Sequence, residues 1–166
     1  MYHTIREFVE EWKMESAATG RLMDALTDES LQQSITPDHR PLGQIAWHIT
    51  QVIGSVSKEG YLEFEKPDGE ELAPTSALKI ASEYKKVSQA LLHAVETQWT
   101  DATLQMTQDM HGEEWSNANL LHLLVQHEVH HRAQMTVLMR QAGLRPSGIY
   151  GPTRDDWMEK GQEPYL

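Results

Sequence analysis

The chain has 166 residues, of which 39% are hydrophobic, and this length and composition predict a single folded domain over residues 1–166. Its formal net charge is −11, which argues against nucleic acid as a partner, because binding to a phosphate backbone needs a basic surface. It has no cysteine, which excludes disulfides, thiolate nucleophiles and Cys-type zinc sites and fits a cytoplasmic location.

Four long segments carry apolar residues at helical spacing. The helices are expected at about residues 2–26, 42–58, 76–99 and 117–142. Pro41 lies near the first turn of the second helix, where proline is favoured. Thr75 is the expected N-cap of the third helix and Ser116 that of the fourth, which Gly143 is expected to end.

The connections between these segments are long and polar, and we predict no strand in them. They include residues 27–41, 61–74 and 101–115. A further short helix is expected after Thr153, with Trp157 packed onto the main body. Four amphipathic helices and no sheet predict an all-α four-helix bundle. No apolar run reaches the roughly 18 residues that a membrane span needs, and the N-terminus lacks a signal peptide, so no membrane partner is expected.

The fourth predicted helix has four histidines in ten residues, at positions 122, 127, 130 and 131. On a wheel with about 100° per residue, two of them fall in the centre of the apolar arc, one turn apart. These are His127 and His131, whereas His122 and His130 point elsewhere. Imidazoles at positions i and i+4 can bind one metal ion. Two buried histidines with ordinary hydrogen bonds are the alternative.

A catalytic metal site needs a third ligand, and His48 is the best candidate. It lies on the second predicted helix, at the edge of an apolar stripe. As ligands, three neutral imidazoles favour a divalent transition metal such as Zn²⁺ or Ni²⁺. A histidine with ordinary hydrogen bonds is again the alternative. The remaining histidines are weaker candidates because of their positions, and they are His3, His39, His93 and His111.

Three further polar residues are candidates for the surroundings of this site. Gln44 precedes His48 by one turn, and Gln134 lies on the histidine face of its helix. Glu128 is a candidate acceptor behind a ligand or a general base, although an interhelical salt bridge is the preferred interpretation. Arg40 and Arg132 are candidates for positive charge at the pocket rim.

Three stretches are similar to a known family. "PLGQIAWHIT" (41–50), "LLHLLVQHEVHHRAQM" (120–135) and the tail "GIYGPTRDDW" (148–157) resemble the DinB-like (YfiT-like) superfamily of metal-dependent enzymes. The resemblance implies a four-helix bundle with long crossover connections, a homodimer, and a metal held by His48, His127 and His131. One departure is Ala133, where the family often has glycine; it faces away from the histidine pair.

Family activities vary, so the resemblance leaves the reaction open. Thiol-dependent transferases belong to the family, and a metal-dependent S-transferase acting on a small molecule with a low-molecular-weight thiol is therefore the first expectation. A metal-dependent hydrolase and a non-catalytic metal-binding module are the alternatives. A purely structural dimer that has kept its histidines is a further one.

Overall fold

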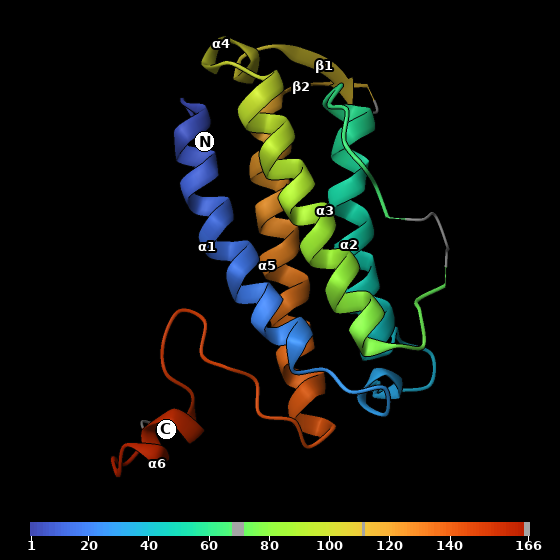
Figure 1. The fold of residues 1–166 in the computed structure, drawn as a ribbon, viewed down its shortest axis with the longest axis vertical. Helices are drawn as coiled ribbons and strands as arrows, with labels where there is room; N and C mark the ends of the chain where they lie inside the picture. The colour runs from blue at the N-terminus through green and yellow to red at the C-terminus, as the bar shows by residue number, and fades with distance from the viewer. Residues whose placement is uncertain (68–71, 111, 165–166) are drawn as a thin grey trace.

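The computed structural model describes residues 1–67, 72–110 and 112–164 and is mostly helical (Figure 1). The four long helices are α1 (Ile5–Asp24), α2 (Leu42–Glu59), α3 (Ala77–Gln98) and α5 (Asn117–Gln141). The short elements are η1 (Ser30–Gln32), α4 (Asp101–Leu104), β1 (Thr107–Met110), β2 (Glu113–Ser116) and α6 (Arg154–Glu159). The predicted all-helical class is confirmed, and the helices begin and end within a few residues of their expected limits.

The long helices pack side by side, and each contacts two of the others most extensively. Helix α1 packs against α3 and α5, and α2 packs against the same two helices. Helices α2 and α3 run in the same direction, so the chain must return between them (Figure 1). The described parts of this connection contact α2 at two places: Pro67 lies at Gly54, and the Ala73 amide donates to Gln44, nearer the start of the helix. The connection from α2 to α3 is therefore long and joins two parallel helices.

Side-chain caps fix the starts of α1, α3 and α5. Thr4 caps α1 in a capping box with Glu7, and Ser116 caps α5. The expected cap Thr75 is wrong: Ser76 caps α3, with its hydroxyl accepting from the Lys79 amide. The reason is a tertiary contact, because Asp28 accepts the next free amide, that of Ala77, at 2.7 Å and so fixes where the helix begins.

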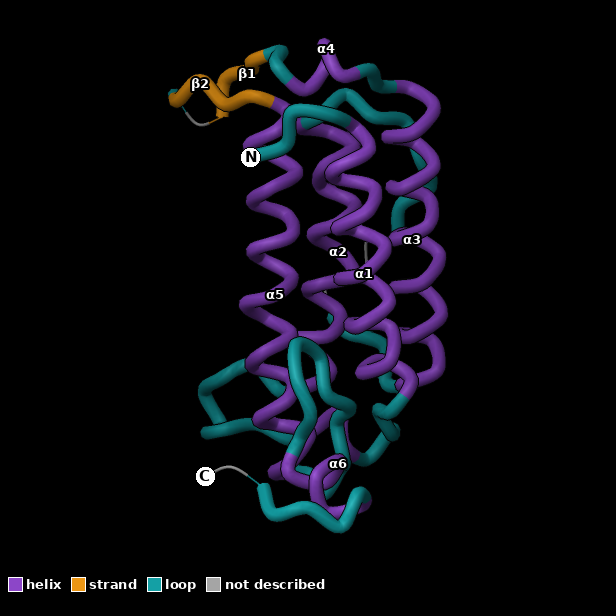
Figure 2. The backbone as a smooth tube through the Cα atoms, turned by 90° about the vertical axis from the view of Figure 1, so that its left-hand side faces the viewer, coloured by secondary structure: helices purple, strands orange, loops and turns teal. Residues whose placement is uncertain are grey.

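The expectation that the connections contain no strand is also wrong. Strands β1 and β2 form an antiparallel hairpin in which Met110 pairs with Glu113. Gly112 has a φ of 90°, which suits the tight hairpin loop. Each strand has only four residues with no fully buried side chain, so the alternation of apolar and polar residues is too weak to detect in the sequence. The hairpin and α4 cover one end of the helices (Figure 2).

The core lies between the four long helices. It contains large aromatic side chains, with Trp12, Trp47 and Tyr84 at most 1% exposed. The C-terminal tail lies at the end opposite the hairpin (Figure 2). Trp157 on α6 is half-buried, and Tyr150 joins the tail to α1 and α5 through Glu15 and Arg132. Within the described residues, no helix is long and apolar enough to span a membrane.

Candidate metal centre

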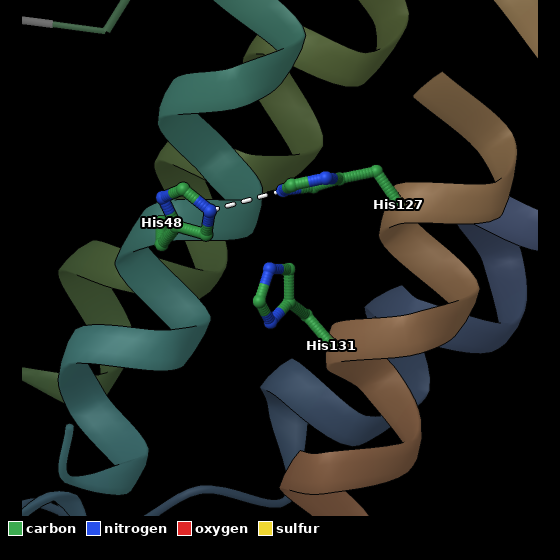
Figure 3. A group of neighbouring side chains, drawn as sticks. All are labelled: His48, His127 and His131. Atoms are coloured by element: carbon green, nitrogen blue, oxygen red, sulfur yellow. Dashed lines mark hydrogen bonds between the residues drawn. The ribbon is translucent and has the colours of Figure 1, made fainter. Parts of the chain in front are cut away.

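Three histidines from two helices meet in the groove between α2 and α5. His127 and His131 lie one turn apart on α5, and His48 faces them from α2 (Figure 3). One ligand atom from each lies within 4.8 Å of the other two. The Nε2 atoms of His48 and His127 are 3.0 Å apart and share a hydrogen bond. The helix packing thus brings together the three residues that the sequence indicated.

The two α5 histidines lie less deeply than the wheel predicted. Both are half-buried at the edge of the groove, whereas the next residues in the chain, Glu128 and Arg132, are 2% and 1% exposed. The expectation of core-facing imidazoles is therefore wrong. Helix α5 packs against α1 as well as α2, so its most buried line lies about one residue, or 100°, away from the histidines.

Burial keeps the three imidazoles in their neutral form. It lowers the pKa of His48 from 6.5 to about 4, with further contributions from His131, Arg40 and His127. Burial likewise lowers the pKa of His127 and that of His131. Neutral imidazoles at pH 7 offer lone pairs, which a metal ion requires of its ligands. The proton shared by His48 and His127 can move to the other ring nitrogen, since neutral imidazole has two tautomers. The residues present therefore fit a divalent metal.

Gln134 fixes the orientation of His131. Its Oε1 atom accepts a hydrogen bond of 2.8 Å from Nδ1 of His131, which leaves the Nε2 lone pair of that imidazole for a metal. The Nε2 atom of Gln134 in turn donates to His130 at 3.2 Å. His130 is exposed, with its ring 4.9 Å from that of His131, and it holds the amide that orients this candidate ligand.

Glu128 and Gln44 both make hydrogen bonds to elements other than α2 and α5. Glu128 accepts from the hydroxyls of Thr19 (2.7 Å) and Tyr84 (2.9 Å), which belong to α1 and α3. Burial raises the pKa of Glu128, and its hydroxyl donors and Arg132 oppose that rise. The amide oxygen of Gln44 accepts from the Ala73 amide, so Gln44 ties α2 to the crossover connection. A role for either residue behind the metal ligands stays a prediction.

Two pockets open from the groove on either side of the histidines. The large pocket, of about 300 Å³, is lined by Ile35, His39, Arg40, Ile45, His131, Gln134, Val137 and Leu138. The small pocket, of about 60 Å³, is lined by Val52, Ser55, Val56, Glu59, Leu120, Leu123, Leu124 and His127. Because His131 borders one pocket and His127 the other, the candidate metal centre lies between them.

Only one of the two arginines expected at the pocket rim lies there. Arg40 borders it, whereas Arg132 is buried against Glu15 on the other side of α5. His39 also lines this pocket, although the sequence placed it only in a loop. The missed signal is the Thr-Pro-Asp sequence just before it, which is typical of a tight turn that fixes the following side chains.

His3, His93 and His122 lie away from the groove. His3 and His93 are exposed, and the ring of His122 packs edge-on against Tyr2 at 6.1 Å. His111 lies outside the described residues.

Comparisons with known proteins agree with this fold. The DinB family model matches residues 1–163. The uncharacterized protein YrdA of Bacillus subtilis (strain 168) is 46% identical over 163 residues, which cover 98% of each chain. A DinB-like protein from Bacillus cereus ATCC 10987 superposes with a TM-score of 0.84 and 44% identity, over 90% of this chain and all of that one.

A second solved structure supports the fold alone. It is the DinB-like protein YjoA of Bacillus subtilis, with a TM-score of 0.66 and 19% identity, over 88% of this chain and 98% of that one. The family match over nearly the whole chain and the identity to YrdA carry the assignment. The chain therefore belongs to the DinB family.

Proposed function

We propose that this protein is a metal-dependent enzyme that transfers a small thiol onto an electrophilic substrate. The observation that carries the proposal is the cluster of His48, His127 and His131, whose ligand atoms lie within 4.8 Å of one another. The cluster is accessible from two pockets rather than closed, as a catalytic metal site must be and a structural one need not be.

The metal would be Zn²⁺ or Ni²⁺, since both accept imidazole nitrogens. When bound, such an ion lowers the pKa of coordinated water or thiol toward neutrality. The protein's own part is to supply three neutral nitrogen donors, with Gln134 orienting His131. Because the chain has no cysteine, the sulfur in a thiol transfer must come from a second substrate.

The two pockets favour transfer over the alternatives. A transfer brings two organic reactants together, and the large pocket borders His131 while the small pocket borders His127, one turn away on the same helix. The alternative is a metal-dependent hydrolase, for which water is the second reactant and one pocket suffices. A non-catalytic metal-binding module is the third possibility, and it requires neither pocket.

The test is an assay with the metal-loaded protein and a chromogenic electrophile, with and without a panel of low-molecular-weight thiols. Transfer predicts acceleration only with thiol, and loss of that acceleration in His48→Ala. The matched control is His93→Ala, which removes an exposed histidine from α3. Equal turnover without thiol would indicate hydrolysis. Metal binding without turnover of any substrate would favour the binding module.

The proposal also covers the oligomeric state of the protein. From the family resemblance we propose a homodimer of one-domain chains, acting in the cytoplasm on a small-molecule substrate. Light scattering of the purified protein measures the mass directly, and a mass of 19.0 kDa, that of one chain, would contradict the dimer.

A further inference from the structure

The large pocket has apolar walls and a cationic rim. Ile45, Val137 and Leu138 form walls on α2 and α5, and Ile35 adds a wall from the loop between η1 and α2. Arg40 and His39 come from that same loop. A volume of about 300 Å³ is at the lower end for small-molecule sites, which are mostly apolar with a few polar groups. The pocket therefore suits a small molecule with an apolar body.

The loop that carries Arg40 is held in shape by a turn. The His39 amide donates to the Thr36 carbonyl at 3.1 Å, and the Thr36 hydroxyl contacts Nδ1 of the His39 ring at 2.5 Å. Pro37 lies inside this turn, where its fixed backbone angle favours the bend. Arg40 follows directly, so its backbone is positioned before any ligand arrives.

Arg40 is an exposed cation whose charge reaches the histidines. Among the described residues it forms no ion pair. After burial, which is the largest cause, its positive charge contributes to the lowered pKa of His48, His127 and His131. In a chain with a net charge of −11, this is a local positive region at one end of the groove.

The other end of the groove has the opposite charge. Glu59 lines the small pocket, which is bordered by His127, whereas Arg40 lines the large pocket, which is bordered by His131. An anionic ligand is therefore attracted to the large pocket and repelled from the small one. A guanidinium also matches a carboxylate with paired hydrogen bonds, which an ammonium group cannot form.

We propose that the large pocket selects a small organic carboxylate, with its apolar body against Ile45 and Val137 and its carboxylate paired with Arg40. That this ligand is the substrate rests on the function proposed above. Its uncharged end then lies toward the histidines, and the small pocket receives the second, smaller reactant. The inference assigns Arg40 as a residue that determines specificity.

The test measures binding by ¹⁹F NMR, with the full-length protein both loaded with Zn²⁺ and treated with a chelator. The probes are 6,6,6-trifluorohexanoate and its neutral analogue 6,6,6-trifluorohexanamide. We expect the carboxylate to bind the chelated protein at least about threefold more tightly than the amide, a size typical of a partly exposed charge pair. Arg40→Gln should abolish that preference.

Two variants control for site and charge. Arg6→Gln removes the same charge from an arginine whose side chain is 85% exposed near the start of α1, and binding should be unchanged. Val137→Phe narrows the large pocket, and it should weaken both probes. Equal binding of the two probes, an Arg40→Gln variant that binds like the wild type, or no binding below about 20 mM would each overturn the inference.

The outcomes separate this inference from the proposed function. Probe binding by the chelated protein does not require a metal, so a protein that binds no metal or turns nothing over can still show the Arg40-dependent preference. Conversely, a protein that binds Zn²⁺ through its histidines but shows no preference for the carboxylate would refute only the role of Arg40.

Discussion

Arg132 is predicted to contribute more to stability than any other charged group on α5. Its side chain is 1% exposed and donates to the carboxylate and backbone carbonyl of Glu15, to the Thr19 hydroxyl and to the Tyr150 hydroxyl. Arg132→Met keeps much of the side chain's length but removes all of these donors. The carboxylate of Glu15, with a side chain 11% exposed, then loses its counter-charge, and buried Glu128 loses a neighbouring one.

The expected cost follows from breaking one side of a buried pair. Removal of one partner typically costs about 3–5 kcal/mol, because the other charge stays buried without compensation. Urea unfolding followed by circular dichroism measures this loss directly. The control is Arg140→Met on the same helix, where the guanidinium is exposed and bonds the Thr136 carbonyl, so its effect should stay within about 0.5 kcal/mol.

The loss of unfolding free energy in Arg132→Met should also depend on pH, because Glu128 titrates. Burial already raises the pKa of this carboxyl, and loss of Arg132 removes a charge that opposes the rise. A folded-state pKa above the unfolded value means that the folded state keeps its proton longer, so stability falls as pH rises above about 4.5. Arg132→Met should therefore be less destabilising at pH 5 than at pH 8. A loss below about 1 kcal/mol at pH 8, or the opposite pH trend, would refute this account of the network.

The other predictions concern the metal centre. At a free Zn²⁺ concentration of about 100 times Kd, the metal should stabilise the fold by about 2.7 kcal/mol, and thermal unfolding should show this shift lost in His131→Ala but kept in His93→Ala, which removes an exposed histidine from α3. Equal behaviour of those two variants would contradict the assignment of His131 as a ligand. Gln134→Leu should weaken Zn²⁺ binding about 10–100-fold by calorimetry, because it frees the His131 ring, whereas the exposed control Gln126→Leu should have no effect. The metal-free protein should lose stability as pH falls from about 6.5 to about 4, because the unfolded state takes up the His48 proton first. Denaturant titrations across this range should show a shallower loss of unfolding free energy in His48→Gln. The same dependence of unfolding free energy on pH in variant and wild type would count against the lowered pKa of His48.

The sequence predicted the helices of this fold better than it predicted how deeply individual side chains are buried. Apolar spacing indicates all four long helices, because each buries a face wide enough to show the helical period. The hairpin of β1 and β2 was missed because its short strands bury no side chain fully. The N-cap of α3 was misplaced by one residue because Asp28, far away in the sequence, accepts the Ala77 amide.

The candidate ligands could be found from the sequence, but their surroundings could not. A helical pair at i and i+4 is visible as spacing, and the family resemblance selected His48. Arg40 was expected at the pocket rim and does line the large pocket, whereas Glu59 was missed because it lies at the end of α2, and only the packing of α2 against α5 brings it to the groove. No local pattern reports a contact made between two helices that are far apart in the sequence.

The same limit explains why the wheel placed the histidines too deep. Apolar residues cover a wide arc of α5, since Leu121 and Val125 are as buried as Leu124, and the centre of so wide an arc is poorly defined by sequence. Packing against both α1 and α2 moves the buried centre to Glu128 and Arg132. Two stripes one residue apart therefore have different tasks: the histidine stripe faces the pockets, and the Glu128–Arg132 stripe joins α5 to the other helices. For this reason substitutions at adjacent positions on α5 should separate ligand binding from stability.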